Sequence, residues 1–237
     1  MSAKQKIILA LDVDNGPAAL ETVDRFGGRV NIYKVGLELF TAEGPSIVRD
    51  IQARGKKVFL DLKFHDIPNT VAKAARTAAR LGVFMFNIHA SAGSEAMRRA
   101  RDEVVELSLK ENLPRPLLIA VTVLTSQNQD ELKTEFGIQH SLRTHVKHLA
   151  GLAKNAGLDG VVASGQEVSM IKEHLGGKFL IVTPGIRPSS YPPDDQKRTM
   201  TPREALRAGA DFIVLGRAVT GQKDPEKALE QIESELA

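Results

Sequence analysis

Two acids and a lysine lie close together in the sequence at the end of an apolar run, and they are candidates for a reaction site. They are Asp61, Lys63 and Asp66. Side chains two residues apart on a strand point the same way, so Asp61 and Lys63 should share one face with Phe59. Opposite charges at the end of a hydrophobic strand are costly unless they are paired. A lysine held by an acid could donate a proton to a carbon that develops negative charge.

A second lysine, Lys34, ends another apolar run and should lie near the same acids. Four groups of alternating charge would keep one another ionised. At about 4 Å and an effective dielectric near 20, each contact amounts to roughly 4 kcal/mol before desolvation. The alternative is structural: Asp61 and Lys63 form an ion pair at a strand end, and Asp66 caps the helix that begins near Pro68.

The C-terminal part of the sequence contains a candidate anion site. Gly216 and Arg217 follow the last apolar run, and Arg187 follows the run before it. Backbone amides at a helix start, together with a guanidinium, can bind phosphate. The alternative is that Gly216 makes a tight turn and Arg217 is a surface charge. Residues 185–199 are rich in Pro, Ser and Asp and show no helical or strand period. A connection of this length is often a lid, from which Gln196 could reach a ligand, or else a disordered surface loop.

Asp12 ends the first apolar run, on the face expected to point inward. Its carboxylate could accept hydrogen bonds from sugar hydroxyls. The alternative is that Asp12 or Asp14 caps the following helix.

Five histidines fall into two groups in the sequence. His140, His145 and His148 resemble metal-ligand spacing, but they lie in a polar helical stretch without an obvious acid partner, so we interpret them as a solvated helix face. His65 and His89 should lie near the pocket as hydrogen-bonding residues of the scaffold.

The elements that position these residues follow from the alternation of short apolar runs with amphipathic stretches. Strands are expected at 7–13, 31–35, 57–63, 84–89, 116–121, 160–163, 179–183 and 212–215. Helices are expected at 18–26, 46–54, 69–81, 94–110, 140–156, 166–174 and 202–208, and a further helix is expected after the last strand, next to Gly216 and Arg217. Glycines that should end helices in the left-handed conformation are Gly27, Gly55, Gly82, Gly157, Gly176 and Gly209.

Eight hydrophobic strands, each followed by a helix, indicate a parallel sheet covered on both faces. Within 237 residues, eight favours a closed (β/α)8 TIM barrel, with one domain spanning residues 1–237. Polar residues at the carboxyl ends of the strands should then converge on one pocket. These residues are Asp12, Lys34, Asp61, Lys63, His89, Thr122, Thr125, Arg187, Gly216 and Arg217.

Composition limits the function classes. The net charge is +3, but the cations are scattered among acids, tryptophan is absent and aromatic residues make up 5%, so a nucleic-acid partner is not expected. Absence of cysteine excludes disulfides and thiolate metal sites. The apolar run near the N-terminus is too short for a signal peptide or a membrane span. We expect a cytoplasmic protein that binds a small anion.

Together these residues closely resemble the bacterial type of the orotidine 5′-monophosphate decarboxylase family, over essentially the whole chain. The matching segments are 10–12, 34–36, 61–70, 121–126, 184–187, Gln196 and 216–217. The Asp-x-Lys-x-x-Asp core alone is shared with sugar-phosphate relatives. Its continuation Ile67-Pro68-Asn69-Thr70, with the segment 184–187 that contains Arg187 and with Gln196, is much more specific to this family.

The resemblance implies decarboxylation of orotidine 5′-monophosphate to uridine 5′-monophosphate, the last step of de novo synthesis of that nucleotide, without cofactor or metal. It implies that Lys63 protonates the ring carbon and that Asp61 lies against the departing carboxylate. Lys34 and Asp12 would hold the ribose, and Thr125 would contact the pyrimidine.

The resemblance also implies a phosphate grip and a homodimer. The phosphate would be held by Arg187, Gln196, Arg217 and the Gly216 amide. Asp66 and Thr70 would reach the ribose site of the partner subunit. Two alternatives remain: a magnesium-dependent sugar-phosphate decarboxylase or synthase of the same superfamily, and a non-catalytic nucleotide-binding barrel.

Overall fold

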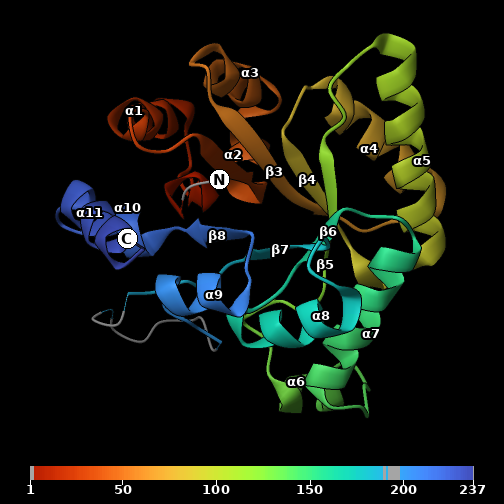
Figure 1. Ribbon diagram of the computed structural model, residues 1–237. Coiled ribbons are helices and arrows are strands. Elements are labelled where there is room, and N and C mark those ends of the chain that lie inside the picture. Colours follow the sequence, from red (N-terminus) through yellow and green to blue (C-terminus); the bar gives the residue numbers. More distant parts are fainter. Residues whose placement is uncertain (1–2, 189–190, 192–197, 237) are drawn as a thin grey trace.

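Eight parallel strands close into a barrel in chain order, with β1 paired to both β2 and β8. The computed structural model describes residues 3–188, 191 and 198–236, and Figure 1 shows helices surrounding the strands. The strands are β1 (Ile7–Ala10), β2 (Ile32–Gly36), β3 (Lys57–Phe64), β4 (Met85–His89), β5 (Leu117–Val121), β6 (Gly160–Val162), β7 (Leu180–Thr183) and β8 (Phe212–Leu215). The expected (β/α)8 TIM barrel is confirmed.

The helices fill the connections between strands. They are α1 (Gly16–Phe26), α2 (Leu37–Glu43), α3 (Ser46–Ala53), α4 (Pro68–Arg80), α5 (Ser94–Glu111), α6 (Gln129–Thr134), α7 (Leu142–Asn155), α8 (Val168–Leu175), α9 (Pro202–Ala208), α10 (Arg217–Thr220) and α11 (Pro225–Glu235). Short 3-10 turns are η1 (Ala3–Lys6), η2 (Ala90–Ala92) and η3 (Gly165–Glu167). All seven helices expected by residue range are present, and α10 begins where a further helix was expected after the last strand, while α2, α6 and α11 were not among the expected helices.

Two expectations about element ends are wrong. β1 ends at Ala10 rather than at residue 13, because the pairing with β2 stops at Ala10 and Lys34, apart from the Leu11 amide, which donates to the carbonyl of Lys34. Gly27 has a right-handed φ of −58°, since the helical turn continues through Phe26, whose carbonyl accepts from the amide of Val30. A positive φ is confirmed at the other glycines, Gly55, Gly82, Gly157, Gly176 and Gly209, although the ψ of 157° at Gly176 lies outside the left-handed helical region.

Alternate side chains of each strand face two separate hydrophobic layers. The barrel interior contains Ile8, Phe59 and Met85, whereas Leu60 and Phe86 belong to the layer between the strands and the helices. This alternation is the period-two pattern expected of a strand buried on both faces. Inward-facing positions at the carboxyl ends of the strands are therefore free to carry polar groups.

Candidate active site

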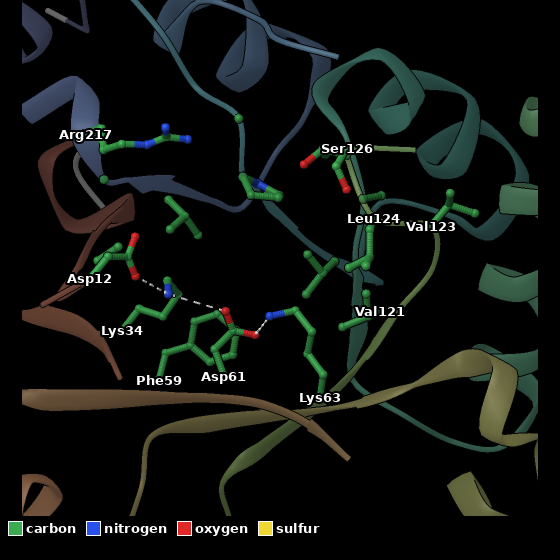
Figure 2. Close-up of a pocket in the computed structure, with 18 of the residues that line it drawn as sticks. Asp12, Lys34, Phe59, Asp61, Lys63, Val121, Val123, Leu124, Ser126 and Arg217 are labelled. Atoms are coloured by element: carbon green, nitrogen blue, oxygen red, sulfur yellow. Dashed lines mark hydrogen bonds and ion pairs between the residues drawn. The ribbon is translucent and has the colours of Figure 1, made fainter. Parts of the chain in front are cut away.

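Four charged side chains form a continuous row at the carboxyl ends of β1, β2 and β3. Lys34 Nζ lies 2.9 Å from Asp12 Oδ1 and 3.5 Å from Asp61 Oδ2. Lys63 Nζ lies 2.8 Å from Asp61 Oδ1. Figure 2 shows this row from Asp12 to Lys63. The charges alternate in sign, so each lysine has a carboxylate partner and Asp61 is shared by both.

Lys34 and Asp61 are the most enclosed members of the row, with side chains 12% exposed. Burial acts to lower the pKa of Lys34, but the carboxylates of Asp61 and Asp12 more than offset it, and the net pKa is raised. Lys34 therefore stays protonated and holds both acids in place.

The backbone of β3 is irregular where it carries the reactive residues. Between Leu60 and Phe64 the strand advances four residues, while its partners on β4 advance two, from Phe86 to Ile88. Lys63 has a φ of +52°. This conformation costs an L-residue about 1–2 kcal/mol, so the surroundings must impose it. The sequence pattern predicts a regular strand over residues 57–63 and gives no sign of this bulge.

Asn87 on β4 holds the irregular segment. Its Nδ2 donates to Asp61 Oδ1 at 2.6 Å, and the backbone amide of Lys63 donates to its Oδ1 at 2.8 Å. The side chain is 1% exposed. Sequence reasoning missed Asn87 because it lies in an apolar strand. The signal in the sequence is that Asn87 is a polar residue at an inward-facing position, two residues before His89 and on the same face of the strand.

The alternatives in which the acids cap helices are wrong. The N-cap of α1 is Asn15, whose side chain accepts from the amide of Ala18, so neither Asp12 nor Asp14 has that role. The N-cap of α4 is Ile67, which makes no side-chain capping bond, and Asp66 only accepts from the Ile67 amide at 2.6 Å.

Arginines from the loops after β7 and β8 also line the site. Arg217 begins α10 directly after Gly216, and a Cβ at Gly216 would lie 3.3 Å from Asp12 Oδ2, so glycine lets the end of β8 approach the acid closely. Arg187 follows β7, and its guanidinium lies 5.1 Å from the centre of the Tyr191 ring. Arg187 donates from its backbone amide to the carbonyl of Met200, which joins the two ends of the loop expected to be a lid.

A cavity of about 270 Å³ lies among these groups. Its charged and polar lining includes Asp12, Lys34, Asp61, Lys63, Thr125, Ser126, Arg187, Gly216 and Arg217. Its apolar lining includes Val162 and Val214, together with Phe59, Val121, Val123 and Leu124, which are labelled in Figure 2. The arrangement can hold a flat ring against aliphatic side chains while Lys63 presents an ammonium group to one of its atoms.

Four expected site residues do not line this cavity, and a fifth lies outside the described residues. Asp66 and Thr70 are exposed, at the β3–α4 connection and in the first turn of α4. The Thr122 hydroxyl donates to the Val162 carbonyl at 2.9 Å, and His89 is absent from the lining. Gln196 is the residue outside the described part of the chain.

A buried ion pair that the sequence did not indicate supports the end of the loop after β7. Arg198 Nη1 lies 2.5 Å from Glu167 Oε1, and its Nη2 donates to the carbonyls of Val123 and Leu124. Burial raises the pKa of Glu167, although the charge of Arg198 opposes the shift. Through these contacts Arg198 joins the loop after β7 to Glu167 in η3 and to the cavity wall after β5.

His65 and His89 lie together, whereas His145 and His148 lie on α7 and His140 precedes that helix, outside the helical stretch expected to contain it. The rings of His65 and His89 are 5.5 Å apart, and burial, followed by the charges of His65 and Lys63, lowers the pKa of His89 to about 4. Within the described part of the chain, no group of three or more His, Cys, Asp or Glu residues is placed to hold a metal ion. No helix there is long and apolar enough to cross a membrane.

Comparison with known proteins gives a consistent result. The model of the orotidine 5′-phosphate decarboxylase / HUMPS family matches residues 5–232. The orotidine 5′-phosphate decarboxylase of Moorella thermoacetica is 50% identical, over 100% of this chain and 94% of its own length. That of Vibrio cholerae is 52% identical, over 98% of both chains.

Solved structures agree over the same span. The crystal structure of an uncharacterized conserved protein from Geobacillus kaustophilus superposes with a TM-score of 0.84 at 38% identity, covering 98% of this chain and 100% of its own. The orotidine 5′-phosphate decarboxylase of Lactobacillus acidophilus gives 0.81 at 36% identity, covering 98% and 99%.

Proposed function

The chain belongs to the orotidine 5′-phosphate decarboxylase / HUMPS family, and from this premise we propose that it converts orotidine 5′-monophosphate into uridine 5′-monophosphate and carbon dioxide. This is a reaction of pyrimidine biosynthesis. The observation that carries the proposal is the row of alternating charges, which ends with Lys63 at the edge of an aliphatic-lined cavity.

The chemistry requires a proton for the ring carbon. When the bond to the carboxylate breaks, its electron pair stays on that carbon, and a new C–H bond forms with a proton from Lys63 Nζ. Asp61 accepts from Lys63 and would lie beside the departing carboxylate, so its charge disfavours the ground state. The ammonium charge of Lys63 would stabilise the developing carbanion before the proton is transferred.

The rest of the row and the apolar wall would orient the nucleoside. Asp12 and Lys34 are assigned to the ribose hydroxyls, because a carboxylate accepts and an ammonium donates at neighbouring positions. Thr125 is assigned to the pyrimidine, since it lies on the cavity wall after β5. The aliphatic side chains beside it favour a flat, partly desolvated ring.

The phosphate is assigned to Arg187, Arg217 and the Gly216 amide, with Gln196 as a further ligand from outside the described residues. Two guanidinium groups provide charge-assisted hydrogen bonds to a phosphate. Because the phosphate lies away from the reacting carbon, its binding energy can be used to organise the site rather than only to hold the substrate.

We further propose a homodimer in which Asp66 and Thr70 contact the substrate bound by the partner subunit. Both residues are exposed and do not line their own cavity. Ile67, between them, is 67% exposed, and Leu37 after β2 is 58% exposed. Large apolar side chains of this exposure are suited to burial between subunits. A cytoplasmic location is proposed as well, because a charged nucleotide does not cross a membrane unaided.

The decisive experiment measures carbon dioxide release from orotidine 5′-monophosphate, in the presence of a chelator, by the wild type and by Lys63→Ala. We expect turnover by the wild type and a loss of about 10²–10⁴-fold in kcat for Lys63→Ala, with uridine 5′-monophosphate still bound. Lys110→Ala, at an exposed position on α5, is the matched control. Magnesium-dependent turnover of a sugar phosphate instead, or binding without turnover by the wild type, would contradict the proposal.

A further inference from the structure

We propose that Asn87 is a positioning residue of the reaction, which holds the Asp61 carboxylate and the Lys63 backbone in their working arrangement. The inference rests on the proposed function, because it concerns the two groups assigned to the chemistry. Asn87 does not line the cavity and lies behind Asp61 on the neighbouring strand. It therefore acts through these residues rather than on the substrate.

The chemistry of the partners fixes the orientation of the amide. A carboxylate can only accept hydrogen bonds and a backbone amide can only donate one, so Nδ2 must face Asp61 and Oδ1 must face Lys63. The observed contacts of 2.6 Å and 2.8 Å have this orientation. A single planar group thus fixes the side chain of one reactive residue and the backbone of the other.

The bulge in β3 gives the bond to Lys63 its importance. The register between β3 and β4 shifts between Leu60 and Phe64, and Lys63 has a φ of +52°. In that segment Asn87 Oδ1, rather than a strand carbonyl, accepts from the Lys63 amide. Without this acceptor a partly buried N–H group would be left unpaired, and the backbone would be expected to relax. The Lys63 ammonium group would then leave its position.

The bond to Asp61 determines how its carboxylate is turned. Oδ1 accepts from both Lys63 Nζ and Asn87 Nδ2, whereas Oδ2 faces Lys34 at 3.5 Å. The amide is a neutral donor, so it stabilises the carboxylate without supplying a competing proton. An aspartate at position 87 would instead place a second carboxylate against the first, and the two could not both ionise readily.

The expected phenotype is a loss of rate without a matching loss of affinity. A displacement of about 1 Å in a reacting group costs about 100-fold in rate. The residues assigned to phosphate and ribose receive no hydrogen bond from Asn87 in the described part of the chain. For Asn87→Ala we therefore expect kcat to fall about 100-fold, while KM and the affinity for uridine 5′-monophosphate change little.

For Asn87→Asp, the pH dependence of kcat distinguishes a positioning role from a purely structural one. A protonated aspartic acid has one O–H donor and one carbonyl acceptor, like the amide, whereas the ionised form has no donor and repels Asp61. The kcat of Asn87→Asp should therefore show a new ionisation, with the activity on its acidic side. The groups already present around this position are Asp61 and Lys63 on β3, Lys34 beyond Asp61, and His89 on β4, while Ile119 on β5 is apolar.

The experiment compares the pH profiles of kcat and KM for wild type, Asn87→Ala, Asn87→Asp and the control Ser108→Ala, which removes a buried hydroxyl on α5. Wild-type kcat in Asn87→Ala, or a profile of Asn87→Asp parallel to the wild type, would overturn the inference. So would failure of both variants to fold, or parallel losses of kcat and nucleotide affinity, because Asn87 would then support the fold as a whole. An inactive wild type would instead contradict the proposed function.

Discussion

The Lys34 ammonium group packs closely against Gly36: a Cβ at position 36 would lie 3.0 Å from Lys34 Nζ. The ammonium group cannot move away without lengthening its contact with Asp12 or with Asp61. Gly36, two residues after the lysine, is therefore required for the arrangement of the charge row.

Gly36→Ala should displace Lys34 by a few tenths of an ångström and lower kcat/KM roughly tenfold, because the shared acid Asp61 moves with it. The φ of Gly36 is −92°, so the backbone tolerates alanine. Steady-state kinetics check this expectation. Gly28→Ala is the control, since a Cβ there would meet nothing within 4 Å. Unchanged kinetics in Gly36→Ala would show that Lys34 has more freedom than its contacts indicate.

Mixing two inactive variants tests whether each site uses Asp66 from the partner. Lys63→Ala and Asp66→Asn dimers, unfolded and refolded together, should recover about a quarter of the wild-type activity, because random pairing makes half of the dimers mixed and each has one intact site. A mixture of Lys63→Ala with Lys34→Ala should recover no activity. Both lysines serve the site of their own subunit, so each site of a mixed dimer lacks one of them. Equal recovery in the two mixtures would contradict the shared-site arrangement.

Arg217→Ala should weaken the binding of uridine 5′-monophosphate about 100-fold, the range expected for a lost charge-assisted hydrogen bond. Binding of uridine, which lacks the phosphate, should not change. Calorimetric titration of both ligands separates the two effects. An equal loss for uridine would mean that Arg217 supports the nucleoside side of the cavity instead.

Stability should fall in mild acid because of His89. Its pKa is about 4 in the folded protein and about 6.5 in the unfolded chain, so the unfolded chain takes up a proton first as the pH falls. The free energy of unfolding should decrease as the pH drops below 6.5 and level off below about 4. Urea unfolding at pH 7 and pH 5 should show a smaller difference for His89→Gln than for wild type. The exposed His174→Gln should keep the wild-type difference.

Arg198→Met should lower the free energy of unfolding by about 3–5 kcal/mol, because Glu167 would stay buried without its cation. It should also raise KM, since Arg198 donates to the carbonyls of Val123 and Leu124 at the cavity wall. Adding Glu167→Gln should recover part of the stability but not the KM. Denaturant titration of both single variants and the double variant gives the coupling energy between the two residues.

The features that sequence could predict are those carried by local periodicity. Period-two alternation predicts Asp61 on the face of Phe59, where the structure has it, and the repeated strand–helix pattern predicts a closed barrel. Lys63 reaches the same cavity, but through the irregular step in β3 rather than through regular alternation. The alternation holds because both faces of each strand are buried, so every second side chain must be hydrophobic on each side.

The missed features all depend on contacts between distant segments. The role of Asn87 depends on the bulge in β3, which brings the Lys63 backbone amide within hydrogen-bonding distance of its side chain. Arg198 and Glu167 pair across two loops, and nothing near either residue in the sequence indicates a buried charge. Local pattern also cannot show a positive φ at a lysine, because no side-chain preference of Lys63 favours it.

The irregular step in β3 limits how this chemistry could be moved to another protein. Copying the Asp-x-Lys motif onto a regular strand would give a lysine with extended backbone, aimed differently from Lys63, and an acid held by no amide. A designer would have to transplant a two-strand module, β3 with its extra residues and β4 with Asn87. The smallest part of this site that could be transferred is thus the paired strands β3 and β4, not the Asp-x-Lys sequence alone.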